Sequence, residues 1–150
     1  MSDEQWVVNN RLIDAAKRGE EDSLEAFILD QENKVNINAK DAVGQTAMHW
    51  AARNGHDGII KILIKYRAGL NVVDPQGESP VFKAAFKDHV DCIRLLVATG
   101  KIDLTLKNKD GQTPLNIAKS EGARKLLVPK AIITSDDEDE SDPEDSDRED

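Results

Sequence analysis

Three stretches of the sequence repeat one pattern at nearly equal spacing. They read DAVGQTAMHWAARNGH from Asp41, DPQGESPVFKAAFKDH from Asp74 and NKDGQTPLNIAKSEGA from Asn108. Their shared glycines lie 33 and 34 residues apart, at Gly44, Gly77 and Gly111. A fixed period of this length is typical of stacked repeats, in which each unit buries its apolar side against its neighbours. The chain is therefore predicted to form a repeat stack rather than one closed domain.

Each unit also carries the residues that start a short helix. An aspartate or asparagine followed three positions later by glycine suits a tight turn, because glycine adopts positive φ without a side-chain clash. Two positions further on, a hydroxyl can accept hydrogen bonds from the free N–H groups of a first helical turn. These hydroxyls belong to Thr46, Ser79 and Thr113, and proline follows at Pro80 and Pro114, where its missing N–H is not needed. A first helix is predicted at each position.

A second helix is predicted after Gly55 and after Asp88, which stands in the place of a glycine. Apolar residues recur there at helical spacing. They are Ile59, Ile60, Leu63 and Ile64 in one unit, and Cys92, Ile93, Leu96 and Val97 in the next. One repeat cannot bury such a stripe alone, so each second helix is expected to pack against a neighbouring repeat.

Both ends of the repeat region depart from the pattern. Residues 12–40 hold two helical segments, LIDAAKRG and DSLEAFILD, but lack the turn and the threonine–proline start. In the last unit Ala123 occupies the expected histidine position, and Pro129 is expected to cut the second helix short. These two segments are predicted to be the N-terminal and C-terminal capping repeats.

Residues 10–127 resemble the ankyrin repeat family, whose pattern is D-x-x-G-x-T-P-L-H-x-A-A-x-x-G-H followed by a second helix and a turn. The resemblance implies an all-α repeat solenoid, an ankyrin stack of about four helix-turn-helix repeats with short β-hairpin loops. The predicted organisation is an N-terminal extension (1–9), an ankyrin domain (10–130) and a disordered acidic tail (131–150), and the domain divides into 10–40, 41–73, 74–107 and 108–130. The family also implies a non-catalytic adaptor that binds proteins.

The histidine of the T-x-x-H motif is kept in one unit only. His49 is present, but Phe82 and Asn116 replace it later, and Ala47 replaces the expected proline. In the family this histidine joins adjacent repeats through hydrogen bonds to the backbone. Two of the three such connections are therefore expected to be weakened or remade.

The reactive residue types have structural interpretations. His49, His56 and His89 all fall on repeat positions, and none pairs with a cysteine or carboxylate at a metal-ligand spacing. Cys92 occupies the register of Ile59, where a small buried hydrophobic residue is expected. We therefore predict no catalytic residue, no metal site and no cofactor.

Partner-binding residues are implied by the resemblance, because family members usually meet partners with their hairpin tips and with the exposed end of each first helix. The tips carry Ala42, Val43, Gln45, Pro75, Gln76, Glu78, Lys109, Asp110 and Gln112, and the helix ends carry Lys17, Arg18, Arg53, Asn54, Phe86 and Lys87, with Ser120 and Glu121 in the last repeat. Arginine and aromatic residues are frequent energetic anchors of interfaces, so Arg53 and Phe86 are expected to contribute most.

The four basic residues at these helix ends would form one column on the concave face, and an acidic partner with an apolar anchor would suit it. Trp50 is left out because we expect it to be partly buried between helices. The alternative is that the column is only a solvated face, as charged helix ends commonly are.

The formal net charge of −9 arises at the C-terminal end. Residues 135–150 carry eleven acids and one base out of 29 acids and 20 bases, which leaves the rest of the chain close to neutral. So many like charges with few apolar residues predict disorder. The segment can serve solubility, attract basic proteins or screen the basic column, or be phosphorylated. The candidate sites have an acid three positions later, a spacing similar to substrates of acidophilic casein-type kinases: Ser135, Ser141 and Ser146.

Other features limit compartment and partners. One cysteine cannot form an intramolecular disulfide, and no apolar segment follows the polar start, so export is not indicated and the protein is expected in the cytoplasm, the nucleus or both. The apolar runs are too short for a membrane span. Nucleic-acid binding is disfavoured, because the tail repels phosphate and the rest of the chain is close to neutral. A monomer is expected.

Two functions stay open. The first is an adaptor whose repeat face recognises a partner protein. The second is an escort or assembly chaperone for a basic client, such as a ribosomal protein or histone, in which the acidic tail shields positive charge.

Overall fold

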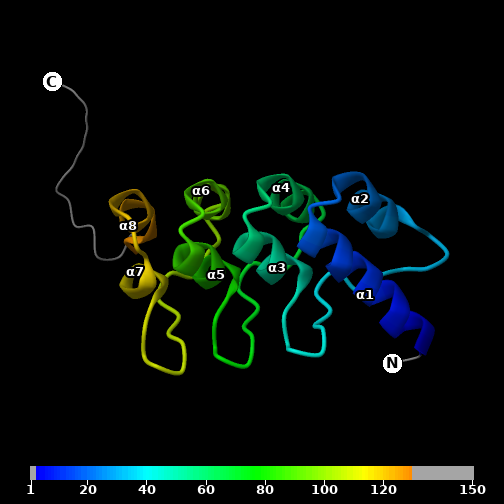
Figure 1. Cartoon of the computed structure of the whole chain (residues 1–150), viewed down its shortest axis with the longest axis horizontal. Helices are drawn as coiled ribbons and strands as arrows, with labels where there is room; N and C mark the ends of the chain where they lie inside the picture. Colours follow the sequence, from blue (N-terminus) through cyan, green and yellow to red (C-terminus); the bar gives the residue numbers. More distant parts are fainter. Residues whose placement is uncertain (1–2, 130–150) are drawn as a thin grey trace, which may run out of the picture.

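The computed structural model describes residues 3–129, and this part of the chain forms two rows of helices (Figure 1). The eight helices are α1 (Asp3–Arg18), α2 (Glu21–Leu29), α3 (Ala47–Asn54), α4 (Asp57–Lys65), α5 (Pro80–Lys87), α6 (Val90–Ala98), α7 (Pro114–Ile117) and α8 (Glu121–Leu127). The first helices, α1, α3, α5 and α7, form one row, and the second helices form the other. Finger-like loops precede α3, α5 and α7 and point away from the second row. The chain is an all-α repeat solenoid.

The loops are hairpin-shaped, although no strand forms within residues 3–129. The turn at the tip of each loop is closed by a backbone hydrogen bond of 2.9 Å, from Asp41 N to the Gln45 carbonyl and from Asp74 N to the Glu78 carbonyl. The glycines at the tips have positive φ, 81° at Gly44 in the first loop. The predicted turns are confirmed.

The predicted start of each first helix is confirmed, but one of the three hydroxyls does not cap. Thr46 Oγ1 accepts from His49 N at 3.3 Å, and Thr113 Oγ1 accepts from Asn116 N at the same distance. Ser79 precedes α5 in the same way, yet its hydroxyl is buried with no hydrogen-bond partner among the described residues. Phe82, three positions on, also has no polar side-chain atom to supply the other half of a capping box.

The apolar stripes of the second helices form a continuous core between the two rows. Leu24, Ile60, Ile93 and Leu127, one from each second helix, are all fully buried. Cys92 belongs to this core with 1% exposure, and burial raises the pKa of its thiol to about 11. Its predicted packing role is confirmed.

Two histidines join successive repeats at the turn between first and second helix. His56 Nε2 donates to the Lys17 carbonyl at 2.9 Å, and His89 Nε2 donates to the Arg53 carbonyl at 3.0 Å. The His56 ring lies over Gly19, where a Cβ would come within 2.8 Å of Nδ1. The glycine is needed for this close approach as well as for its φ of 73°.

The junction between the third and fourth repeats lacks such a histidine. Gly55 lies under the His89 ring, but in the next repeat its place is taken by Asp88, with a φ of 60°. The helix that follows is capped by Ser120, whose Oγ accepts from Ala123 N at 3.1 Å. A side chain is tolerated at position 88 because no imidazole ring lies over it.

The expectation that Ala123 takes the histidine position is wrong. The N-cap residue of α4, His56, comes ten positions after Thr46, whereas the N-cap residue of α8, Ser120, comes only seven positions after Thr113. The first helix of the last repeat is shortened, so α8 begins earlier than the repeat period predicts. Ala123 lies inside α8 and is fully buried.

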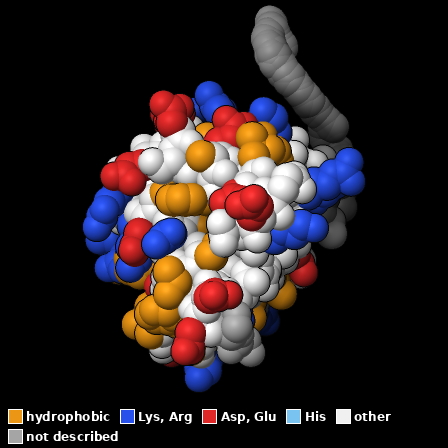
Figure 2. Space-filling model, turned by 90° about the vertical axis from the view of Figure 1, so that its right-hand side faces the viewer, with side chains coloured by type: hydrophobic (Ala, Val, Ile, Leu, Met, Phe, Trp, Pro, Cys, Tyr) orange, Lys and Arg blue, Asp and Glu red, His pale blue; other side chains and the backbone are white. Residues whose placement is uncertain are grey.

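The N-terminal end of the stack is covered by α1 and α2. Helix α1 starts at Asp3 and so crosses the boundary predicted between residues 9 and 10. Viewed from this end, the surface shows small hydrophobic groups interspersed with acidic and basic side chains (Figure 2). Trp6 and Leu29 are about half exposed, at 56% and 52%.

Within residues 3–129, none of the helices combines the length and the apolar character that crossing a bilayer requires. The predicted tail, 131–150, with its candidate phosphorylation sites Ser135, Ser141 and Ser146, lies outside the described residues.

Candidate protein-binding face

A hollow of about 500 Å³ lies on the side of the stack formed by the first helices and the hairpin loops. It is bounded by α3, α5 and the loops that precede them, and its lining consists of Val43, Gln45, Trp50, Arg53, Glu78, Lys83, Phe86 and Lys87. Six of these eight were predicted as partner-binding residues from the sequence. The structure thus places predicted tip residues and predicted helix-end residues around one cavity.

The two acids beside this hollow are both bonded to one lysine of the protein. Lys83 Nζ lies 2.7 Å from Asp74 Oδ2 and 2.8 Å from Glu78 Oε1. Gln45 Nε2 donates to the same Asp74 oxygen at 2.7 Å, and the backbone N–H groups of Gln76 and Glu78 donate to Asp74 Oδ1. Burial alone would raise the pKa of Asp74, but these bonds outweigh it and hold the pKa at about 2.

His49 also holds the loop that contains Asp74 and Glu78. Its Nδ1 accepts from Thr46 N at 3.1 Å, so Nε2 carries the proton and donates to the Glu78 carbonyl at 2.9 Å. The side chain is fully buried, and burial lowers its pKa against the opposing effect of the Glu78 bond. The predicted connection between repeats is present here. In the fourth repeat Asn116 keeps only the local cap, donated by Thr113 N to Asn116 Oδ1 at 2.8 Å.

Two cations lie near the ring of Trp50 at the edge of the hollow. Lys17 Nζ is 4.5 Å and the Arg53 guanidinium 5.2 Å from the ring centroid, distances at which cation–π attraction operates. The indole Nε1 donates to Asp41 Oδ2 at 2.8 Å, which fixes the ring orientation. The expectation that Trp50 is partly buried is confirmed, since its exposure is intermediate.

Phe86 repeats this arrangement one repeat further on. It is 54% exposed, with Lys119 Nζ 4.5 Å and Lys87 Nζ 5.9 Å from its ring centroid. The two aromatic rings and their cations follow one another along the first helices, and we call them the cation–aromatic row: Lys17, Trp50, Arg53, Phe86, Lys87 and Lys119. Among residues 3–129, Arg53, Lys87 and Lys119 form no ion pair, so the row presents uncompensated positive charge.

The remaining predicted residues lie around this row or along the loops. Asn54 Nδ2 donates to the Lys17 carbonyl at 3.0 Å, and Arg18 is exposed at the end of α1. Lys109 N donates to the Gln76 carbonyl at 2.9 Å, which joins two neighbouring loops. Four others line the loops outside the hollow: Ala42, Pro75, Asp110 and Gln112.

Sequence reasoning missed three residues of this face. Trp50 was set aside because of its burial, and Lys83 was not considered because its role depends on two acids of the preceding loop. Lys119 was missed because the shortened α7 moves the helix end. The residues named in its place, Ser120 and Glu121, instead cap and begin α8. Lys119 has no aromatic neighbour in the sequence, and its proximity to Phe86 is visible only in the structure.

The arrangement offers charge and apolar contact rather than metal-ligand chemistry. No group of three or more His, Cys, Asp or Glu residues within the described part of the chain is arranged to hold a metal ion. Both ring nitrogens of His49 are occupied by hydrogen bonds within the protein.

Comparison with known proteins gives the same fold. The sequence profile "Ankyrin repeats (3 copies)" matches residues 12–108. Similar proteins include tyrosine-protein kinase HTK16 of Hydra vulgaris (27% identical over 120 residues, 79% of this chain and 16% of the kinase). BCL-6 corepressor-like protein 1 of Homo sapiens is 33% identical over 97 residues, which are 65% of this chain and 5% of that protein. Probable protein S-acyltransferase 23 of Arabidopsis thaliana is 34% identical over 94 residues, 62% of this chain and 18% of the transferase.

The chain therefore spans less than a fifth of the length of each of these relatives, which differ in the activities that their names state. What they share with this chain is the repeat region. By the match over residues 12–108 and by its paired helices and hairpin loops, this chain belongs to the ankyrin repeat family, a protein–protein interaction fold.

Proposed function

We propose that the protein is a non-catalytic adaptor that binds an acidic segment of a partner protein across the cation–aromatic row. The observation that carries this proposal is the charge balance of the hollow. Its acids are paired with Lys83, while Arg53 and Lys87 have no carboxylate partner within residues 3–129. A partner carboxylate placed there would gain charge-assisted hydrogen bonds without displacing an internal ion pair.

The aromatic rings specify the partner further. The faces of Trp50 and Phe86 already hold the protein's own cations, so a cationic ligand would have to displace these and is disfavoured. The exposed half of Phe86 remains available for an apolar side chain. An acidic residue near a large apolar residue is therefore the expected recognition pattern, with Phe86 and Arg53 as anchors.

Selection of displayed random peptides on the full chain tests this proposal. Wild-type protein should enrich peptides in which Asp or Glu lies within a few residues of an aromatic or aliphatic side chain. Arg53→Glu with Lys87→Glu should abolish that enrichment, because both ligand cations are reversed. The matched control is Lys61→Glu with Arg94→Glu, which makes the same charge change on the exposed side of α4 and α6. Enrichment that survives in the first variant, or is lost in the control, would contradict the proposal.

The escort function is the second candidate, and the eleven acids of residues 135–150 favour it. In this case the same selection would enrich Lys- and Arg-rich peptides. Their binding would vanish when the acids of 135–150 are changed to Asn and Gln and would persist in the Arg53→Glu, Lys87→Glu variant. The two functions thus differ both in the charge of the ligand and in the variant that removes it.

A further inference from the structure

The edge of the stack where the second helices end carries two successive hollows. The first edge groove, of about 540 Å³, lies between the end of α4 and the end of α6. The second, of about 430 Å³, lies between the end of α6 and the end of α8. Ile64 lines the first groove and Val97 lines the second, and the two residues occupy equivalent positions in successive repeats. Neither groove contains a residue of the cation–aromatic row.

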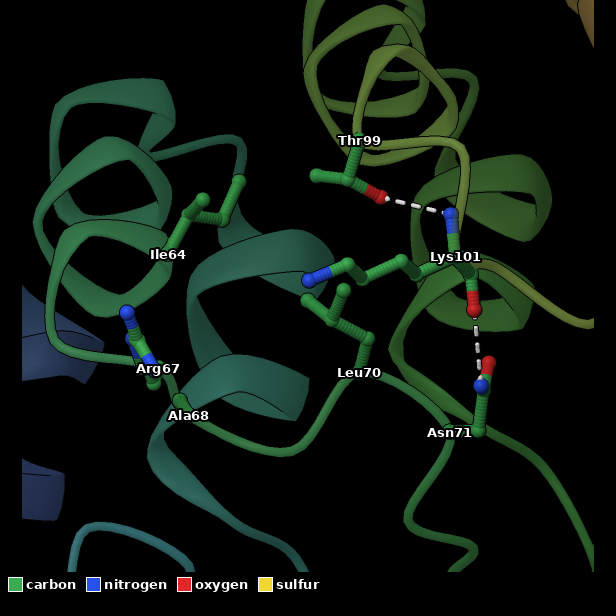
Figure 3. A pocket seen from close by; sticks show the side chains of 7 residues that line it. All are labelled: Ile64, Arg67, Ala68, Leu70, Asn71, Thr99 and Lys101. Carbon is green, nitrogen blue, oxygen red and sulfur yellow. Dashed lines mark hydrogen bonds between the residues drawn. The ribbon is translucent and has the colours of Figure 1, made fainter.

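The first edge groove has an apolar floor and a fixed outer wall. Figure 3 shows Lys101 extending from the next repeat toward Leu70 and Ile64, with Arg67 on the opposite side. Asn71 Nδ2 donates to the Lys101 carbonyl at 3.0 Å, and Lys101 N donates to Thr99 Oγ1 at 3.2 Å. These bonds hold the backbone at position 101, while the Lys101 ammonium group forms no ion pair with the residues that the structure describes.

The groove is also positively charged. Arg67 and Lys101 are its only ionisable lining residues in the described chain, and neither forms an ion pair there. Arg67 adopts a φ of 65°, whereas Gly100 occupies the equivalent position of the next repeat with a φ of 73°. A side chain at such φ is disfavoured. The chain therefore has an arginine at a position where the next repeat has glycine, the residue that adopts this φ without strain.

We propose that residues 131–138 of the chain itself occupy this groove. The described chain ends at Pro129, and Val128 and Pro129 line the second edge groove. The sequence continues with Ala131, Ile132 and Ile133, the only aliphatic side chains among residues 131–150, and then with SDDE at 135–138. The segment therefore places an apolar pair before a cluster of acids, which matches the apolar floor and the two cations of the groove.

The lengths agree with this path. Neighbouring helices of a stack lie roughly 8–10 Å apart, so the first groove is about that far from the second. An extended chain covers about 3.3–3.6 Å per residue, and three to four residues beyond Pro129 suffice to bring Ile132 and Ile133 there. The next few residues carry the acids to Lys101 and Arg67. Tethering raises the local concentration to roughly the millimolar range, so even a weak contact would be populated.

Methyl NMR of the full-length chain, labelled at isoleucine and leucine methyls, tests this placement. We expect nuclear Overhauser cross-peaks from Ile132 and Ile133 to Ile64 and Leu70 that persist on dilution. Ile132→Asp with Ile133→Asp removes the methyl groups proposed to fill the groove and should therefore shift the Ile64 methyl signal. Circular dichroism of the variant checks that the repeat domain stays folded.

A second pair of variants tests the charges. Arg67→Gly with Lys101→Gln should weaken the same cross-peaks, and glycine suits the φ at position 67, so this variant is expected to fold. Lys61→Gln with Arg94→Gln removes two exposed charges elsewhere and should leave the peaks unchanged. Loss of the peaks on dilution, which would indicate a second copy, would overturn the proposal. So would their absence, or a response of the Trp50 indole in place of Ile64, which would put the segment on the cation–aromatic row.

Discussion

Thr46 and Ser79 occupy equivalent positions before two first helices, yet only one of them caps its helix. The Thr46 hydroxyl accepts from His49 N, whereas the Ser79 hydroxyl is buried and has no partner among the described residues. Thr46→Ala should lower the free energy of unfolding by about 1 kcal/mol, the usual value of a cap. Ser79→Ala should change it by less than about 0.5 kcal/mol, because no bond is lost. Urea unfolding of the two variants provides the comparison, and an equal loss in both would contradict this assignment.

His49 makes the stability of the protein depend on pH. Burial lowers its pKa in the folded state below the ordinary value, so the unfolded chain binds a proton first as the pH falls. The free energy of unfolding should therefore decrease on acidification below about pH 6.5, the usual pKa of histidine. It should stay level above that pH as far as this residue is concerned.

The variant His49→Asn isolates the effect. Asn116 shows that asparagine preserves the local cap at this position. We expect a loss of about 1 kcal/mol at pH 7.5, because the bond to the Glu78 carbonyl is absent. The decrease between pH 7 and pH 5 should become smaller than in the wild type. A pH dependence that is unchanged in the variant would show that another group is responsible.

At the scale of helices, the last repeat is held less firmly than the others. The two earlier junctions each have an imidazole that bonds to the end of the preceding first helix, and the junction to α7 and α8 has Ser120 and Asp88 instead. Asp88→Gly with Ser120→His recreates the arrangement of Gly55 and His89. The two changes should be coupled favourably by about 1 kcal/mol, because the ring needs a glycine below it.

Hydrogen exchange measures this coupling directly. In the wild type, amides of α8 should exchange through local opening before those of α3 and α4. The double variant should slow exchange in α8 more than the two single variants combined. Purely additive effects would mean that the glycine contact does not matter at this junction.

At the scale of the whole molecule, Asp74 links the second and third repeats, because its carboxylate accepts from Gln45 Nε2 and also pairs with Lys83 beside the hollow. The pKa of Asp74 is held at about 2, so the stabilisation that this carboxylate provides is present above its unfolded pKa near 3.8 and is lost as the pH falls toward 2. Acid unfolding should therefore show a steep decrease in this window. In Asp74→Asn the decrease should be smaller, and circular dichroism at pH 2–5 measures the difference.

Much of the fold and part of the candidate site were predictable from the sequence. The repeat period located the helix starts at Ala47, Pro80 and Pro114, because each start depends on residues within one turn. It also assigned Cys92 to the core, and it gathered Arg53, Phe86 and Lys87 near one another. These features follow from local chemistry and from the periodicity of apolar residues.

Other features depended on contacts between repeats. The shortened α7 placed Ser120 at the cap and Lys119 beside Phe86, which the repeat period alone did not indicate. That the Ser79 hydroxyl is buried and does not cap α5 was also not visible in the repeat pattern. The pairing of Asp74 and Glu78 with Lys83 became visible only when loop and helix were placed together.

The sequence by itself determined that this chain is a stack of paired helices with hairpin loops, because turn, cap and apolar stripe recur with one period and each acts locally. Only the tertiary structure decided which charges on its surface remain without a partner and which rings hold cations. That outcome depends on distances of a few ångströms between side chains of different repeats, and the spacing of residues along one chain does not specify them.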